Sequence, residues 1–248
     1  MRLAVTGATG RMGRAILTAA DDRDAAVVLA VARESTTAVG HPVVPDDDVA
    51  ARLREAEADV LVDFSAPAAT ARYAEACAES GVALVSGTTG LDDDARAALD
   101  DAAERVPVLH AANFARGAAT LERLLADAVD ALPTYDLELV ETHHAGKRDA
   151  PSGTAGALLD AAGVAEDDRV HGREGEAPRA DGEVGVHAVR AGAVAGEHEA
   201  ILAGDGEELR LTHRAGDRQV FAEGALDAAA WLAGRDPGRH AFRAVIES

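Results

Sequence analysis

The densest group of reactive side chains in the sequence lies between residues 138 and 155. There a predicted strand delivers His143 and His144 to a loop that carries Lys147, and a helix then opens at Ser152-Gly153-Thr154. Imidazole and ammonium groups can transfer protons or bind anions near neutral pH. The first amides of a helix and the positive end of its dipole favour a carboxylate. This order of residues predicts a cationic pocket that holds an acidic substrate and supplies a proton to it.

Two other interpretations of His143 and His144 stay open on residue types alone. The pair could lie on the surface, or it could join Asp149 in a metal site. A metal site needs three or four suitable ligands, and no further ligand cluster accompanies these residues. Cys77 is the only cysteine, which excludes disulfides and multi-cysteine metal sites. We therefore expect no bound metal.

Lys147 is the only lysine of the chain, and the other 23 of its 24 basic residues are arginine. Codon bias together with an acidic surface suited to high salt accounts for much of this composition. However, arginine stays protonated, whereas a lysine can be tuned to release its proton. The retained lysine therefore indicates a position that arginine cannot serve. The 44 acidic residues give a net charge of -20, which disfavours nucleic-acid binding.

Three glycines, Gly7, Gly10 and Gly13, separate a first predicted strand at Arg2–Thr6 from a helix that runs to Ala20. Glycines at such a place permit a tight turn and the close approach of backbone amides to a pyrophosphate. The spacing GxxGxxG is a variant of the commoner GxGxxG. A purely structural turn is the alternative, but the position between strand and helix favours a dinucleotide.

The residues at the end of the second predicted strand, Ala26–Ala32, should determine whether the protein prefers NAD or NADP. An acidic side chain there binds the free ribose hydroxyls, whereas an arginine pairs with a 2′-phosphate. Ala32 stands where an acid is common, and Arg33 follows it. We expect NADPH and/or NADH to bind, with NADPH favoured. In the alternative, Arg33 is a solvated charge and Glu34 takes the ribose.

Short apolar strands alternate with helices over the first 114 residues. The remaining predicted strands of this part are Val60–Asp63, Ala83–Ser86 and Val106–His110. Such runs form a parallel sheet covered on both faces, so we expect an α/β fold whose first part, residues 1–114, is a Rossmann-like doubly wound parallel sheet that binds the dinucleotide. Ligands bind beyond the carboxyl ends of these strands, where we expect Thr88, Thr89 and Asn113 to line the nicotinamide side.

The pattern changes after Phe114. A helix at Gly117–Ala131 and a strand at Asp136–Thr142 come first, and the Gly- and acid-rich stretch 163–183 is expected to be an exposed loop. Three successive strand-like runs then indicate an antiparallel or mixed sheet: Gly185–Arg190, Glu197–Ala203 and Glu208–Arg214. We expect a second, α+β domain at 115–216, and a C-terminal helix and tail at 217–248 that return to the first domain.

Composition narrows the class of protein further. A 48% apolar fraction supports a buried core. No apolar run approaches the roughly 18 to 20 residues of a membrane span. The sequence enters a strand pattern at Met1, which leaves no room for a signal peptide. We expect a cytoplasmic protein that binds neither membranes nor nucleic acid.

Residues 138–155 resemble the signature E-[IV]-x-E-x-H-x-x-x-K-x-D-x-P-S-G-T-A of the 4-hydroxy-tetrahydrodipicolinate reductase (dihydrodipicolinate reductase) family, with Leu139 as the one departure. The resemblance extends from Met1 to about Phe242. Further segments similar to the family stand in the same order: Gly7–Gly13, Asp63–Ser65, Gly87–Gly90, Ala112–Phe114, and Val189–Gly192 followed by Gly196–His198.

The resemblance implies a role for each site residue. His143 would be the general acid and base, and Lys147 a second proton donor that also anchors a substrate carboxylate. The second domain would bind substrate and form a homotetramer through its sheet. Substrate-binding residues would be His144, Gly153 and Thr154. Cofactor-binding residues would be Gly7, Ala8, Thr9, Gly10, Arg11, Met12, Arg33, Gly87, Thr88, Thr89, Ala111, Ala112, Asn113 and Phe114.

The reaction implied is the NAD(P)H-dependent reduction of a cyclic imine dicarboxylate in lysine and diaminopimelate biosynthesis, with loss of water from the hydroxylated form. Two other functions share only the glycine loop. An aspartate dehydrogenase-like reductase would lack the stretch from His143 to Thr154, and a non-catalytic NAD(P)H-sensing module would have no use for His143 or Lys147.

Overall fold

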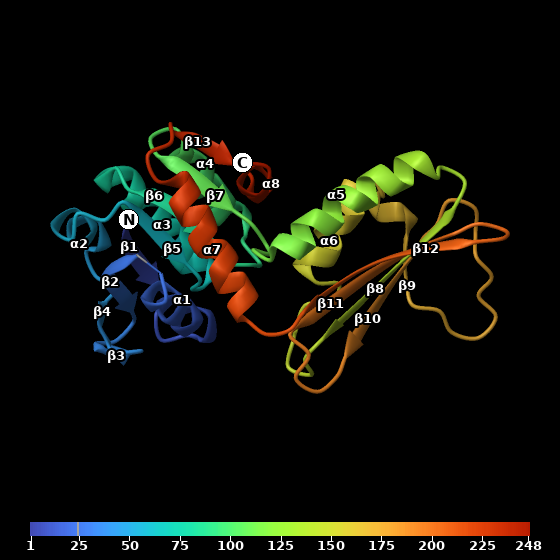
Figure 1. The fold of residues 1–248 in the computed structure, drawn as a ribbon, viewed down its shortest axis with the longest axis horizontal. Coiled ribbons are helices and arrows are strands. Elements are labelled where there is room, and N and C mark those ends of the chain that lie inside the picture. The colour runs from blue at the N-terminus through green and yellow to red at the C-terminus, as the bar shows by residue number, and fades with distance from the viewer. Residues whose placement is uncertain (24) are drawn as a thin grey trace. The chain divides into compact units, whose positions relative to one another are not determined.

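Unbroken apolar runs form the strands of the first sheet, whose order is β13-β7-β6-β5-β1-β2-β4-β3 (Figure 1). The structure is a computed structural model that describes residues 1–23 and 25–248. Most strands are buried on both faces, as a sheet covered by helices on both sides requires. The strands are β1 (Arg2–Thr6), β2 (Ala26–Ala32), β3 (Thr36–Ala38), β4 (His41–Pro45), β5 (Val60–Asp63), β6 (Ala83–Ser86), β7 (Pro107–His110) and β13 (Gly238–His240).

Two groups of helices pack on this sheet. Helices α1 and α7 contact each other, whereas α2, α3 and α4 form a separate contacting series. The sequence sets several of their ends: Pro67 lies in the first turn of α3, and Asp92 accepts a hydrogen bond from the Ala95 amide at 2.9 Å at the start of α4. The helices are α1 (Arg11–Asp21), α2 (Val49–Glu55), α3 (Pro67–Ser80), α4 (Asp93–Ala103), α7 (Gln219–Leu232) and α8 (Phe242–Ile246).

The predicted doubly wound parallel sheet is confirmed, and the structure adds one antiparallel pair at its edge, where β3 pairs with β4. Val39 and Gly40 form the two-residue connection, with φ of 50° and 81°. Positive φ at both positions is the geometry that a tight hairpin needs. The strand on one side of this turn has only three residues, which is too short for an apolar pattern to reveal.

The chain order reverses between β1 and β5, because β2 and β4 extend the sheet on one side of β1 whereas β6 and β7 follow β5 on the other. Ligands of doubly wound folds bind at such a reversal, beyond the carboxyl ends of the strands. Asp63, at the end of β5, is fully buried at this point. Its carboxyl group accepts hydrogen bonds from the hydroxyls of Thr6, Ser65, Thr70, Ser86 and Thr88, at 2.5 to 3.1 Å.

Asp63 should therefore hold together the strand ends that position the loops. We expect Asp63→Ala to lower the free energy of unfolding by about 3 kcal/mol, because four buried hydroxyls and the partly buried hydroxyl of Ser65 lose this acceptor. Urea denaturation measures this change. Asp47→Ala is the control, since Asp47 forms an exposed ion pair with Arg52 and should leave the urea midpoint almost unchanged. Equal effects of the two substitutions would contradict the role of Asp63.

The second sheet is mixed, with the order β12-β11-β8-β10-β9. β10 runs parallel to β8 and β9, and β11 runs antiparallel to β8 and β12. Leucines of α5 and α6 pack with one face of the sheet, while Val140 and Ile201 of the opposite face stay partly exposed. The elements are α5 (Arg116–Ala131), β8 (Asp136–His143), α6 (Gly153–Ala161), β9 (Arg169–His171), β10 (Val184–Arg190), β11 (Gly196–Ala203) and β12 (Glu208–Ala215).

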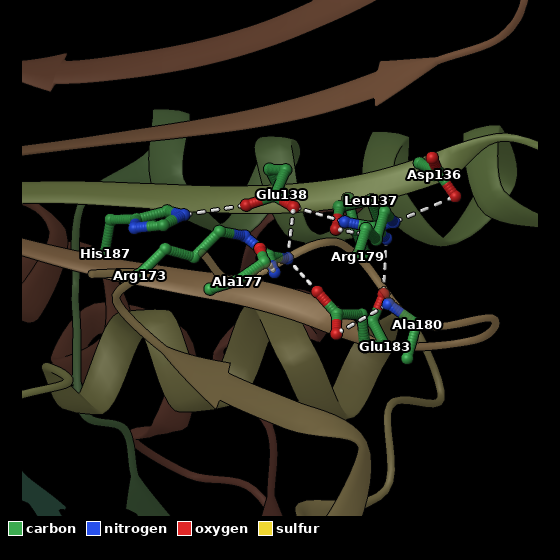
Figure 2. A network of polar contacts seen from close by, with 9 residues as sticks. All are labelled: Asp136, Leu137, Glu138, Arg173, Ala177, Arg179, Ala180, Glu183 and His187. Carbon is green, nitrogen blue, oxygen red and sulfur yellow. Dashed lines mark hydrogen bonds and ion pairs between the residues drawn. The ribbon is translucent and has the colours of Figure 1, made fainter. Parts of the chain in front are cut away.

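The stretch 163–183 is more ordered than the predicted exposed loop. It contains a short 3₁₀ helix at Glu166–Asp168 and the edge strand β9. Figure 2 shows Arg173 and Arg179 reaching Glu138 of β8, with Arg173 also paired to Glu183. Beyond Val164, which packs against the core of the second unit, charged contacts hold this stretch, so its sequence carries no hydrophobic periodicity that would predict its structure.

By its contacts the chain divides into two units, residues 1–114 with 218–248, and residues 115–217. The last stretch belongs to the first unit through α7, whose Gly224 lies so close to the Phe114 carbonyl that a Cβ atom there would be 1.7 Å from the oxygen. No helix within residues 1–23 and 25–248 is long and apolar enough to cross a membrane.

Candidate active site

Strand β8 places Glu141 and His143 on the same face, because side chains two residues apart in a strand point the same way. Both are buried. The His143 Nδ1 atom lies 2.5 Å from Glu141 Oε2. A carboxylate can only accept a hydrogen bond, so Nδ1 carries the proton in this contact. The other ring nitrogen, Nε2, is left to exchange a proton with a substrate.

Arg190 of β10 fixes Glu141 from the neighbouring strand. Its two terminal nitrogens lie 2.8 and 2.7 Å from the two carboxylate oxygens, a bidentate pair. The amide of Ser152 also donates to Glu141, at 3.2 Å. The Glu141 carboxylate thus contacts β8, β10 and the start of α6 at once.

These contacts set the charges of the pair. Burial raises the pKa of Glu141, but hydrogen bonds from Arg190 and His143 outweigh it, and the net pKa is lowered. Burial lowers the pKa of His143; Glu141 opposes this, while Lys147 and Arg190 add to it, and the net pKa is lowered. Glu141 is therefore ionised near neutral pH. Only the cationic form of His143 carries a proton on Nε2, and its lowered pKa means that this form gives the proton up readily.

Lys147 lies in the loop after β8, where its Nζ atom is 2.9 Å from Asp149 Oδ1. Its side chain is one fifth exposed, so a small anion can reach it. The same ion pair contributes to a lowered pKa of Asp149, against burial, which raises it. The Asp149 carbonyl in turn accepts a hydrogen bond from Arg190 at 2.6 Å. Arg190 therefore connects the loop of Lys147 with the Glu141–His143 pair.

The first turn of α6 begins with Gly153 and Thr154. Ser152 caps this helix, because its hydroxyl accepts a hydrogen bond from the Ala155 amide at 3.2 Å. The hydroxyl also lies 3.0 Å from Nε2 of His198, a buried residue of β11. A capped helix start with its positive dipole end suits a substrate carboxylate.

Gly196 leaves room beside the reactive nitrogen of His143. A Cβ atom at position 196 would lie 3.1 Å from His143 Nε2. On the same side, the ring of His198 makes an edge contact with the His143 ring, with centroids 5.2 Å apart. Burial, the largest cause, lowers the pKa of His198 to about 3, so this neighbour is neutral at working pH.

The glycine loop of the first unit has the shape that close approach to a pyrophosphate requires. Gly7 has φ of 65°, and a Cβ at Gly13 would lie 2.1 Å from the Gly7 carbonyl oxygen. The loop leads directly into α1, which starts at Arg11 after the N-cap residue Gly10. Backbone and helix dipole thus present a ready site for phosphate groups, so these residues fit a dinucleotide.

A cavity of about 380 Å³ opens beside this loop. Arg33 lines it, and Glu34 is not among its lining residues. A second arginine, Arg72 of α3, also lines it, but is paired with Asp46 at 2.9 Å. Residues at the ends of four different strands meet here: Gly7, Thr9 and Gly10 after β1, Ala32 at the end of β2 with Arg33 after it, Asp46 after β4, and Phe64, Ser65 and Ala66 after β5.

The residues expected on the nicotinamide side follow β6 and β7. The Thr88 hydroxyl donates a hydrogen bond to Asp63. Phe114 is buried, and its ring centroid lies 5.6 Å from that of Phe64 and 5.0 Å from that of Phe242. Only the backbone of these two residues is therefore available to a ligand. Thr89 and Ala112 are exposed, and Gly87, Ala111 and Asn113 are partly buried.

In the second unit, Glu141 and Arg190 connect His143 with the loop of Lys147 and with the helix start that holds Gly153 and Thr154. In the first unit, the glycine loop and Arg33 line one cavity. The sequence analysis assigns no role to Glu141, Arg190 or Asp63. A signal was present for Glu141, since strand alternation places it on the face of His143. In the described part of the chain no three His, Cys, Asp or Glu side chains are grouped so as to hold a metal ion.

The chain matches the family described as dihydrodipicolinate reductase, with the N-terminus part over residues 1–114 and the C-terminus part over residues 117–246. It is 53% identical over 252 residues to the 4-hydroxy-tetrahydrodipicolinate reductase of Haloarcula marismortui, covering 100% of this chain and 99% of that one. It is 51% identical over 249 residues to that of Natronomonas pharaonis, with 99% and 100% covered.

Among solved structures, a dihydrodipicolinate reductase from a Paenisporosarcina species with dipicolinate bound is similar in fold, with a TM-score of 0.78, 21% identity and 97% of each chain covered. The aspartate dehydrogenase of Thermotoga maritima is similar at a TM-score of 0.52 and 10% identity, with 95% of this chain and 97% of that one covered.

Proposed function

The chain belongs to the dihydrodipicolinate reductase family, and from this premise we propose how its residues divide the work of the reaction. The enzyme is an NAD(P)H-dependent oxidoreductase that reduces 4-hydroxy-tetrahydrodipicolinate to tetrahydrodipicolinate, with loss of water, in lysine and diaminopimelate biosynthesis. The contact between Glu141 and His143, beside Lys147 and the start of α6, is the observation that supports the assignment of roles below.

In this proposal His143 gives the substrate its proton. When bound, the reduced nicotinamide supplies the hydride, and the carbon next to the one that receives it takes up a proton. His143 Nε2 can supply that proton because Nδ1 is held by Glu141, which leaves Nε2 as the exchanging atom. Lys147 is a second proton donor and pairs with a substrate carboxylate, since its ammonium group is partly exposed.

The substrate carries two carboxylates, and the second unit offers two groups of residues that can bind them. We assign one to Lys147 and His144, and the other to the Gly153 and Thr154 amides at the start of α6. Residues 115–217 would then form the substrate-binding domain, and residues 1–114 with the returning C-terminal stretch the dinucleotide-binding domain.

The assay that tests the activity follows oxidation of NADPH and NADH at the nicotinamide absorbance. The synthase that makes dihydrodipicolinate supplies substrate in the same cuvette, and the assay is run at low and at molar salt. Turnover with NADPH favoured supports the proposal. Folded protein that binds NADPH but turns over neither cofactor at either salt level would contradict it.

Arg33 should favour NADPH, because it lines the cavity beside the glycine loop and can pair with a 2′-phosphate. We expect Arg33→Ala to lower kcat/KM with NADPH by about tenfold to a hundredfold, which corresponds to a lost charge-assisted contact. The value with NADH should change by less than about threefold, since NADH lacks that phosphate.

Arg72→Ala is the control in the same cavity, because Arg72 is already paired with Asp46. We expect it to change the NADPH to NADH ratio less than Arg33→Ala does. A ratio unaltered by Arg33→Ala would favour the alternative in which Arg33 is a solvated charge.

We further propose a homotetramer in the cytoplasm. The partly exposed apolar side chains on the uncovered face of the second sheet, including Val140, Val189 and Ile201, support assembly through that face. Light scattering on the purified enzyme measures the mass, and a monomer at micromolar concentration would contradict this assembly.

A further inference from the structure

Glu141 contacts three groups of the candidate site: the His143 ring, the Arg190 guanidinium and the Ser152 amide. Its carboxylate meets His143 at 2.5 Å, Arg190 at 2.7 and 2.8 Å, and the Ser152 amide at 3.2 Å. The side chain is fully buried, so water does not compete for these contacts. A buried carboxylate with this many partners is held in one position.

We propose that Glu141, neutralised by Arg190, is a positioning residue that fixes the tautomer and orientation of His143 and ties it to the substrate-binding start of α6. This inference rests on the proposed role of His143 as proton donor. Glu141 itself touches neither substrate nor cofactor in this proposal.

The first part of the argument concerns the tautomer. A neutral imidazole carries its proton on either nitrogen, and a hydrogen bond at one nitrogen decides which. Because Glu141 accepts from Nδ1, Nε2 alone gains and loses the catalytic proton. The Gly196 backbone lies next to Nε2, where the lack of a side chain leaves space.

The second part concerns charge. A lone buried carboxylate would bind the His143 proton strongly and hinder its transfer. Arg190 offsets this, since it places a positive charge on the same carboxylate. The other groups facing His143 are Lys147 from the loop and His198 from β11, and His198 is neutral at working pH. Thus Glu141 raises and Arg190 lowers the proton affinity of His143.

The third part concerns α6. The Ser152 amide donates to Glu141, and the Ser152 hydroxyl caps the helix and contacts His198. The Glu141 carboxylate therefore holds in place both the proton donor His143 and the start of α6, to which we assign a carboxylate of the substrate. A shift of Glu141 would displace both together.

The opposite effects of the two partners provide the test. The pH dependence of kcat/KM reports the pKa values of the free enzyme. In Glu141→Gln the limb that depends on His143 should move to lower pH by roughly one unit, because the raising influence is lost. In Arg190→Gln the same limb should move to higher pH, because a lowering charge is lost. A merely structural loosening would not move the limb in opposite directions.

Glu138→Gln is the matched control. Glu138 lies on the same strand and also binds arginines and a histidine, but belongs to the opposite face. It should leave the pH profile unchanged. Limbs that stay in place, or move the same way, in Glu141→Gln and Arg190→Gln would overturn the inference.

A measurement on the unaltered enzyme covers the case in which a variant does not fold. Nitrogen-15 spectra of the histidine rings, with His143 assigned through His143→Gln, should show the tautomer protonated on Nδ1. The opposite tautomer would overturn the inference even with His143 essential. If His143→Gln keeps full turnover instead, it is the proposed proton donor that fails, so the two failures are distinguishable.

Discussion

Replacing His143 with glutamine should lower kcat by roughly 10²- to 10⁴-fold, the usual contribution of a positioned acid or base. Glutamine keeps a polar group of similar reach but cannot carry a proton between substrate and solvent. Binding of NADPH should not change, because the glycine loop and the Arg33 cavity belong to the other unit. Steady-state kinetics with both cofactors, together with NADPH titration by fluorescence, measures these two effects separately.

His187→Gln is the matched control for this prediction. His187 lies on β10, next to β8, and contacts Glu138 at 2.7 Å rather than Glu141. Its substitution should leave kcat within about twofold of the unaltered enzyme, as expected for a residue outside the site. A His143→Gln enzyme with near-normal kcat would remove His143 from the mechanism.

Lys147→Arg is the second substitution for which we expect a large loss, about a hundredfold in kcat. The guanidinium keeps the positive charge and can still pair with Asp149 and with a carboxylate. It stays protonated at every working pH, however, and so cannot act as a proton donor. KM should change much less than kcat, since attraction for the substrate is kept.

The neighbouring residue provides the control for Lys147→Arg. Arg148 is exposed, and Arg148→Lys makes the reverse exchange one position away, with little expected effect. If Lys147→Arg turns over at a near-normal rate, Lys147 serves only to bind a carboxylate, and His143 is the one proton donor.

The sequence predicted best those features in which the backbone itself limits the residue type. Gly7 needs a positive φ, and Gly13 has no room for a Cβ atom, so both glycines are visible as a pattern. The parallel strands were equally visible, since burial on both faces leaves unbroken apolar runs. Ser152 could be placed at a helix start because its hydroxyl replaces a missing helical acceptor.

Features that depend on register between distant strands could not be predicted. Arg190 contacts Glu141 only because β10 pairs with β8 in a register that places Arg190 opposite His143. No local sequence pattern reveals that register. Asp63 likewise gains its hydroxyl partners from two strand ends, two loops and helix α3. The 163–183 stretch is held by arginines that look in the sequence like ordinary surface charges (Figure 2).

The division of the chain into two units determines the order in which they can fold during translation. Residues 115–217 form one uninterrupted stretch, whereas the first unit needs residues from both ends of the chain. Helix α7 buries Ala222, Ala225 and Leu232 in that unit and contacts β5, β6 and β7. During translation the second unit leaves the ribosome complete while the cofactor unit still lacks this helix. The nascent enzyme must therefore keep an apolar sheet face uncovered until its final thirty or so residues emerge.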